Sequence, residues 1–151
     1  MILLINICKE KLHFYEFVKP VWDIVNSTNQ KVVVKHYSGL TSNDIKKADK
    51  VIICGTSLKD NDFLEHIDRF SWIKDFNKPL LGICGGMQII AIINGKQLTK
   101  KAQIGLIDNK YHLHNFAVKG LKNELKIRNY QGYLFHPEVR NKEMIEGFVS
   151  Q

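Results

Sequence analysis

The sequence has 151 residues, three cysteines and a formal net charge of +7, and 44% of its residues are hydrophobic. This length is typical of one domain whose core needs neither disulfides nor metals, so we expect a single domain over residues 1–151. No apolar run approaches the roughly 18 residues of a membrane span. The odd cysteine count without a secretory signal favours the cytoplasm. The lysines are scattered, which favours a solvated basic surface over nucleic-acid binding.

Apolar strands alternate with helical patterns in the first half of the chain. Three apolar runs are typical of strands buried in a parallel sheet: residues 1–8, 31–37 and 51–54. Three further segments show helical spacing or helix-start residues: 12–25, 41–48 and 62–75. This alternation predicts an α/β fold with a parallel sheet, in which ligands bind beyond the carboxyl ends of the strands. Cys8 and Cys54 end two of the runs, and we expect them to be small buried apolar residues.

The segment 78–90 predicts a short strand, a tight turn and an apolar helix. Gly82, Cys84 and Gly86 form G-x-C-x-G, the cysteine counterpart of the nucleophile elbow. A nucleophile on such a turn points out of the sheet, and the flanking positions must be nearly without side chains so that the helix can pack on its strand. The N–H of Gly85 at the helix N-terminus can receive negative charge, and the same helix terminus lowers a thiol pKa.

The second half of the chain offers a base for this cysteine. Its pattern predicts a small hairpin over 96–105, strands over 111–118 and 129–135, and a helix over 141–149, with only a weak pattern over 120–128. His136 and Glu138 are two residues apart and would point the same way on an extended segment. A carboxylate beside an imidazole fixes its orientation, so Cys84, His136 and Glu138 could act as nucleophile, base and orienting group.

Both motifs resemble those of the class I, or triad-type, glutamine amidotransferases, which carry G-x-C-x-G-x-Q and F-H-P-E. Here the motifs run from Gly82 to Gln88 and from Phe135 to Glu138. The resemblance implies a flavodoxin-like, mostly parallel sheet with helices on both faces. It also implies hydrolysis of the side-chain amide of L-glutamine without a metal or organic cofactor, and transfer of the ammonia to a separate synthetase. The run Cys-Gly-Gly-Met-Gln is somewhat closer to the glutaminase of GMP synthase than to those of anthranilate or carbamoyl-phosphate synthases.

The resemblance also implies roles for further residues. The family has a glycine-rich loop after the third strand that contributes an oxyanion-hole N–H, and here Gly55 matches while Thr56 departs from the pattern. The family's glutamine, here Gln88, contacts the substrate glutamine. A His-containing strand, for which Leu113 and His114 are the best matches, holds the substrate α-carboxylate. The chain is shorter than typical members on both sides of His114.

Other interpretations stay open. The chain could be a class I-like hydrolase of another γ-glutamyl or peptide substrate. It could also be a non-catalytic regulatory module, for which the altered turn after the third strand and the missing segments would be support. Cys84 could be a buried structural thiol. His112 and His114 would point to one face of a strand, but no third ligand is obvious, so no metal site is expected.

Overall fold

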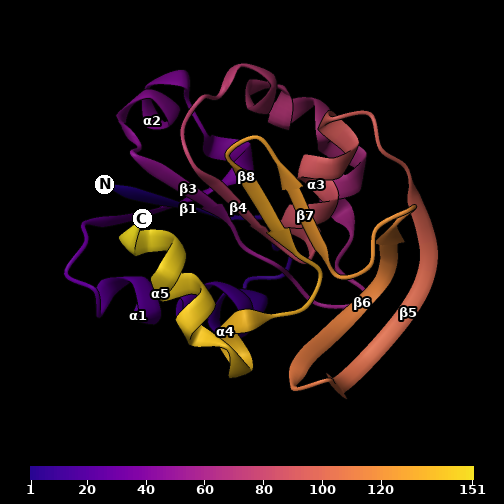
Figure 1. Cartoon of the computed structure of the whole chain (residues 1–151). Coiled ribbons are helices and arrows are strands. Elements are labelled where there is room, and N and C mark those ends of the chain that lie inside the picture. Colours follow the sequence, from indigo (N-terminus) through magenta and orange to yellow (C-terminus); the bar gives the residue numbers. More distant parts are fainter.

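The computed structural model describes residues 1–151. Its main sheet has six strands in the order β2-β1-β3-β4-β8-β7 (Figure 1). The strands are β1 (Ile2–Asn6), β2 (Val32–His36), β3 (Lys50–Ile53), β4 (Leu80–Ile83), β7 (Glu124–Ile127) and β8 (Tyr130–Tyr133). All pairs are parallel except β7 with β8. The mostly parallel sheet is therefore confirmed, and its first five strands follow the flavodoxin-like order.

Helices cover both faces of this sheet, as predicted (Figure 1). They are η1 (Phe14–Val18), α1 (Lys19–Asn26), η2 (Tyr37–Gly39), α2 (Ser42–Lys47), η3 (Asp62–Asp75), α3 (Gly85–Ile93), α4 (Pro137–Arg140) and α5 (Lys142–Ser150). Leu3 and Ile5 of β1 pack in one core cluster with η3 and α3, whereas Ile2 and Leu4 pack in a second with α1 and α5. None of the helices has the length and apolar character that crossing a membrane requires.

Two predicted helices differ in detail from regular α-helices. The segment predicted over 12–25 begins as the π-turn η1 and continues as α1, with Pro20 in the first turn of α1, where a missing N–H leaves no bond unmade. The segment over 62–75 is the 3₁₀ element η3, which is broken at His66, where φ is −128° and ψ is 34°. Its buried residues, Phe63, Phe70 and Ile73, still face α3 and the sheet.

A two-stranded antiparallel ribbon stands apart from the main sheet. It consists of β5 (Leu98–Ile107) and β6 (Lys110–Val118), so the small hairpin predicted over 96–105 is wrong. Those residues form one arm of a longer hairpin that turns at Asp108 and Asn109, both with φ near +50° to +60°. Two such residues are typical of a type I′ turn, which joins antiparallel strands. The ribbon follows α3 and leads into β7, so it hangs beside the carboxyl ends of β4 and β8 (Figure 1).

Candidate active site

Cys84 lies in the sharp turn between β4 and α3. Its φ of 51° and ψ of −104° are rare for a residue with a side chain. The flanking glycines permit this turn because the backbone is crowded on both sides. A Cβ on Gly82 would come within 2.5 Å of the backbone of Gly86, and one on Gly86 within 2.3 Å of the carbonyl oxygen of Ile53. The G-x-C-x-G spacing therefore follows from the packing of α3 on its own strand.

His136 and Glu138 contact each other, although not in the predicted way. Nδ1 of His136 lies 2.9 Å from Oε2 of Glu138, and both side chains are fully buried. The extended segment expected for them is wrong. His136 precedes α4 as its N-cap, and Glu138 lies in the first turn of that helix, which begins at Pro137. A proline at the first helical position is favourable because its fixed φ suits the helix.

Gly55, after β3, brings this pair together with Cys84. A Cβ on Gly55 would lie 2.7 Å from Cε1 of His136 and 3.2 Å from Cβ of Cys84, so the three residues are in close contact. Nε2 of His136 is buried and has no hydrogen-bond partner. The thiol of Cys84 donates to the carbonyl of Leu113 at 3.6 Å. The structure thus places a thiol, an imidazole and a carboxylate in sequence at the carboxyl edge of the sheet.

The charges around His136 favour its protonated form. Complete burial acts to lower the pKa of His136, but the carboxylate of Glu138 and the thiolate of Cys84 outweigh this and hold the pKa well above its ordinary value. The other two cysteines behave differently. Burial raises the pKa of Cys54 far above its usual range and that of Cys8 to about 11, so both remain neutral thiols, as expected for small buried residues.

Six of the nine predicted site residues line one small cavity beside the thiol: Thr56, Cys84, Gly85, Gln88, Leu113 and His114. The cavity has about 10 Å³ of free space, which is room for about one water molecule and too little for a glutamine side chain. The ribbon closes it, because Leu113, His114 and Asn115 belong to β6. Asn115 also donates to the carbonyl of Leu58 at 2.9 Å, which ties the ribbon to the loop after β3.

The predicted oxyanion and substrate groups differ in whether they are free. The N–H groups of Gly55 and Thr56 donate to no backbone carbonyl, and Gly85 begins α3, whose first N–H groups have no partner within the helix. By contrast, Nε2 of Gln88 donates to the carbonyl of Phe116 at 3.1 Å, while its Oε1 is buried without a partner. Donors for an oxyanion are therefore available, whereas the substrate-side groups contact the ribbon.

The two ribbon histidines pair with each other. Nδ1 of His112 lies 3.2 Å from Nε2 of His114, and both residues are buried. Burial, with the neighbouring His112, lowers the pKa of His114 to about 4, and burial also lowers the pKa of His112. Nδ1 of His114 bonds to the carbonyl of Lys101 at 3.2 Å, which links the two strands of the ribbon. Both rings are therefore neutral near pH 7.

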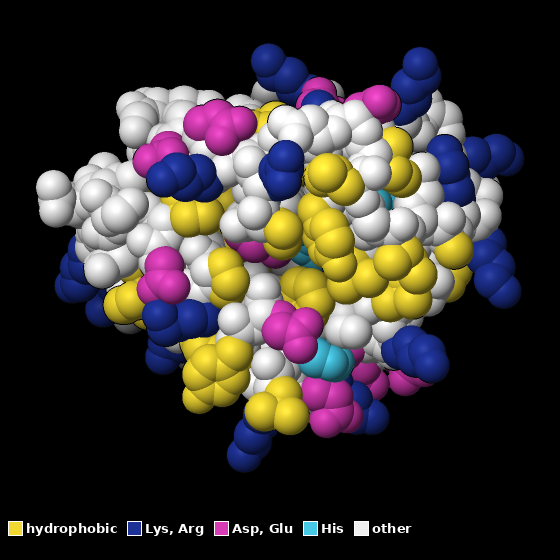
Figure 2. All heavy atoms as spheres, turned by 90° about the horizontal axis from the view of Figure 1, so that it is seen from below, with side chains coloured by type: hydrophobic (Ala, Val, Ile, Leu, Met, Phe, Trp, Pro, Cys, Tyr) yellow, Lys and Arg dark blue, Asp and Glu magenta, His cyan; other side chains and the backbone are white.

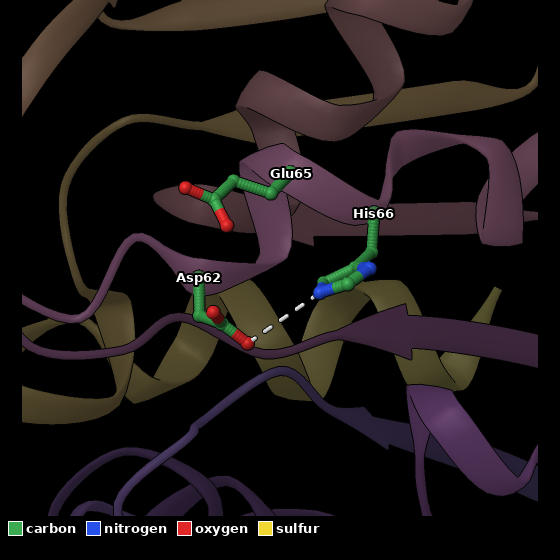
Figure 3. A group of neighbouring side chains, drawn as sticks. All are labelled: Asp62, Glu65 and His66. Carbon is green, nitrogen blue, oxygen red and sulfur yellow. Dashed lines mark ion pairs between the residues drawn. The ribbon is translucent and has the colours of Figure 1, made fainter.

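A group of potential metal ligands lies on η3, outside the cavity lining. Asp62, Glu65 and His66 have ligand atoms within 4.8 Å of one another (Figure 3). Nε2 of His66 is 3.8 Å from Asp62 Oδ2, and the hydroxyl of Tyr37 donates to the same oxygen at 3.5 Å. These are partly exposed side chains of a kind that is common without an ion. They contribute nothing to the geometry around Cys84.

Several residues near the site were not singled out by their sequence pattern. The ring of Phe17 packs against that of His136 with 5.3 Å between centroids, and the N–H of His136 donates to the carbonyl of Tyr111 at 2.7 Å. The carboxylate of Asp60 accepts from the hydroxyl of Thr56 at 3.0 Å. Phe17 appears in the sequence only as one apolar position of a helix. These contacts join segments far apart in the chain, so local spacing carries no signal for them.

Solved structures similar to this chain are glutamine amidotransferases. A protein from Thermoplasma acidophilum, described as a proposed glutaminase-type component of GMP synthase, superposes with a TM-score of 0.81 at 18% identity, covering 99% of this chain and 92% of that one. A glutamine amidotransferase from Thermotoga maritima gives 0.65 at 18% identity, covering 99% and 82%. One from Methylobacillus flagellatus gives 0.61 at 13% identity, covering 99% and 74%. These likenesses show the fold.

A search of curated protein sequences finds no match. The model of the family described as glutamine amidotransferase class-I matches residues 14–150, nearly the whole chain. That range includes the turn at Cys84 and the His136–Glu138 pair, and the sheet order agrees with the fold of the similar structures. The chain therefore belongs to the class I glutamine amidotransferase family.

Proposed function

We propose that residues 1–151 form a single glutaminase domain, which hydrolyses L-glutamine to glutamate and ammonia and passes the ammonia to a separate synthetase. The observation that carries this proposal is the contact between three groups. Cys84 occupies a strained turn, Gly55 holds it against His136, and His136 is bonded to Glu138 at 2.9 Å. Nucleophile, base and orienting group are the parts that acyl transfer from an amide requires.

In the proposed reaction Cys84 acts as the nucleophile. Its thiolate attacks the carboxamide carbon, and the N–H groups of Gly85 and of the Gly55–Thr56 turn receive the negative oxygen. His136 gives its proton to the leaving nitrogen, so ammonia departs and a γ-glutamyl thioester remains. His136 then takes a proton from water, whose oxygen attacks the thioester and releases glutamate. Glu138 keeps the imidazole oriented and stabilises its charged form.

Substrate binding requires the ribbon to move. A cavity of about 10 Å³ holds no glutamine, and the Leu113 carbonyl occupies the space next to the thiol. When β6 shifts, Gln88 loses its bond to Phe116 and both ends of its amide become available to the substrate. The backbone around Leu113 and His114 then borders the bound glutamine, where it can hold the α-carboxylate.

The proposed partner is a synthetase that uses ammonia. GMP synthase is the favoured one, because the similar structure with the highest TM-score given above is described as a component of that enzyme. Exposed hydrophobic side chains lie on three segments that border the site: Leu12 before η1, Ile104 and Leu106 on β5, and Val139 on α4. Hydrophobic side chains also gather on the face seen in Figure 2. Apolar surface of this kind suits a protein partner.

The test is release of glutamate and ammonia from L-glutamine by the purified chain, with Cys84→Ala beside it. We expect equal amounts of both products from the wild type and none from the variant. In parallel, a glutamine-mimicking electrophile should add its mass to Cys84, with Cys8 and Cys54 as unmodified internal controls. Labelling without turnover would mean a competent site that waits for its synthetase. Turnover in the variant would contradict the nucleophile, and neither turnover nor labelling would favour another substrate or a regulatory module.

A further inference from the structure

Asp60 is a buried carboxylate outside the three proposed catalytic groups. It is 5% exposed, and its Oδ2 is surrounded by donors. The hydroxyl of Thr56 donates to it at 3.0 Å, the N–H of Lys9 at 2.9 Å, the N–H of Glu10 at 3.4 Å, and Nδ1 of His13 at 2.8 Å. A buried charge is costly unless it is bonded in this way. Asp60 therefore joins the loop after β1 to the turn after β3.

The partner of Asp60 that bears on the reaction is Thr56. Thr56 is 4% exposed and lines the cavity next to Cys84, and its N–H has no backbone acceptor. Its neighbour Gly55 touches both Cys84 and His136. Because a β-branched side chain has few χ1 positions, fixing the hydroxyl of Thr56 also fixes the direction of its backbone. Glycine, which the family often has in this loop, offers no such anchor.

A second line of contacts leads from Asp60 to the imidazole. His13, bonded to Asp60, packs edge-on against Phe17 with 6.1 Å between ring centroids. Phe17 in turn packs against His136 at 5.3 Å. The same carboxylate thus holds the oxyanion turn on one side of the site and the aromatic wall of the imidazole on the other.

We propose that Asp60 is a positioning residue, which holds the Thr56 turn so that its N–H groups meet the negative oxygen formed during glutamine hydrolysis. This inference rests on the proposed function. Donors aimed in advance at a developing charge are worth far more than donors that must first reorient, and misplacement by about 1 Å can cost on the order of 100-fold in rate. Asp60 supplies this fixed aim through Thr56.

The test compares kcat and KM for glutamine hydrolysis in the wild type, Asp60→Ala, Asp60→Asn, Thr56→Val and the Asp60→Ala/Thr56→Val double variant. We expect kcat to fall about 10- to 100-fold in Asp60→Ala and in Thr56→Val, with KM changed less than about threefold. The double variant should be no worse than either single one, because both break the same link. Asp60→Asn keeps an acceptor for the hydroxyl and should recover most of the rate.

Two further measurements separate positioning from a general loss of structure. Alkylation of Cys84 by iodoacetamide forms no oxyanion, so its rate should stay within about threefold of wild type in all variants. Asp62→Ala, two residues along the chain and not bonded to Thr56, is the matched control and should keep its kcat. Thr56→Val keeps the shape of the side chain and tests the link even if Asp60→Ala does not fold.

The outcomes are distinct for the two proposals. An active wild type with an equally active Asp60→Ala or Thr56→Val would overturn the role of Asp60 and leave the glutaminase intact. Parallel losses of kcat and of alkylation would also overturn it, because they indicate a disturbed thiol instead of a disturbed oxyanion turn. A wild type that takes the electrophile on no residue and releases no glutamate would overturn the proposed function and this role with it.

Discussion

The absent side chain of Gly55 lets the imidazole of His136 lie against the backbone of the turn after β3. A methyl group at this position would come within 2.7 Å of Cε1 of His136, well inside van der Waals contact. The ring sits in a packed wall and has no open space behind it, because Phe17 covers it on another side. The distance between the proposed base and nucleophile therefore depends on a residue that takes no part in the chemistry.

Gly55→Ala should lower the rate of glutamine hydrolysis by about 100-fold, because the imidazole must shift away from Cys84 to make room. The measurement is kcat, with circular dichroism to verify the fold. Gly39→Ala is the matched control, since a Cβ there meets nothing within 4 Å, and it should be as active as wild type. Full activity in Gly55→Ala would show that the wall yields easily.

Glu138→Gln should lower the pKa of His136 towards its ordinary value, because the carboxylate is what chiefly opposes the effect of burial. Loss of the orienting charge should also reduce kcat by about 100- to 10,000-fold. Titration of the His136 ring protons by NMR measures the first effect and glutamate release the second. An unchanged pKa would mean that the Cys84 thiolate alone sustains the charged ring.

His114 makes stability sensitive to acid. Its pKa is about 4 in the folded chain, below the ordinary 6.5 of an exposed histidine. Between these values the unfolded chain binds more protons, so the free energy of unfolding should fall as the pH drops from 6.5 to 4, by on the order of 3 kcal/mol. Urea unfolding at several pH values tests this. The loss should shrink in His114→Gln and persist in His66→Gln, whose ring is largely exposed.

Asn115→Ala should open the site. Its side chain bonds the ribbon to the carbonyl of Leu58, and without this bond β6 should leave Cys84 more often. Iodoacetamide should then alkylate the nearly buried thiol several-fold faster than in wild type. Asn43→Ala, on the exposed start of α2, provides the comparison and should react at the wild-type rate. Equal rates in both variants would indicate that other contacts hold the ribbon closed.

The parts of the fold that follow local rules could be predicted from the sequence. Apolar runs identify the central strands, and the helix start at Thr41 is a capping box in which Thr41 and Asp44 each bond the other's N–H. The glycines around Cys84 predict the nucleophile turn because no other residue fits there. In each case the structural cause lies within a few residues of its effect.

The remaining features depend on contacts between distant segments. β7 is an edge strand in which only Leu125 is buried, so its pattern is weak. β5 is mostly exposed and basic, so its length is hidden in the sequence. The short helix α4 brings His136 and Glu138 together through a turn, where an extended segment would have given the same spacing. The closed cavity and the bonds of Asp60 arise only when three loops meet at one edge.

The ribbon has its own hydrogen-bonded ladder and shares no strand with the main sheet. Residues 98–118 can therefore change in length or composition without disturbing the packing that strains Cys84 or seats His136. This division would let the chemistry remain constant while the recognition of substrate and partner diverges. Exchange of this ribbon between family members is accordingly a natural route to new specificity on an unchanged reaction centre.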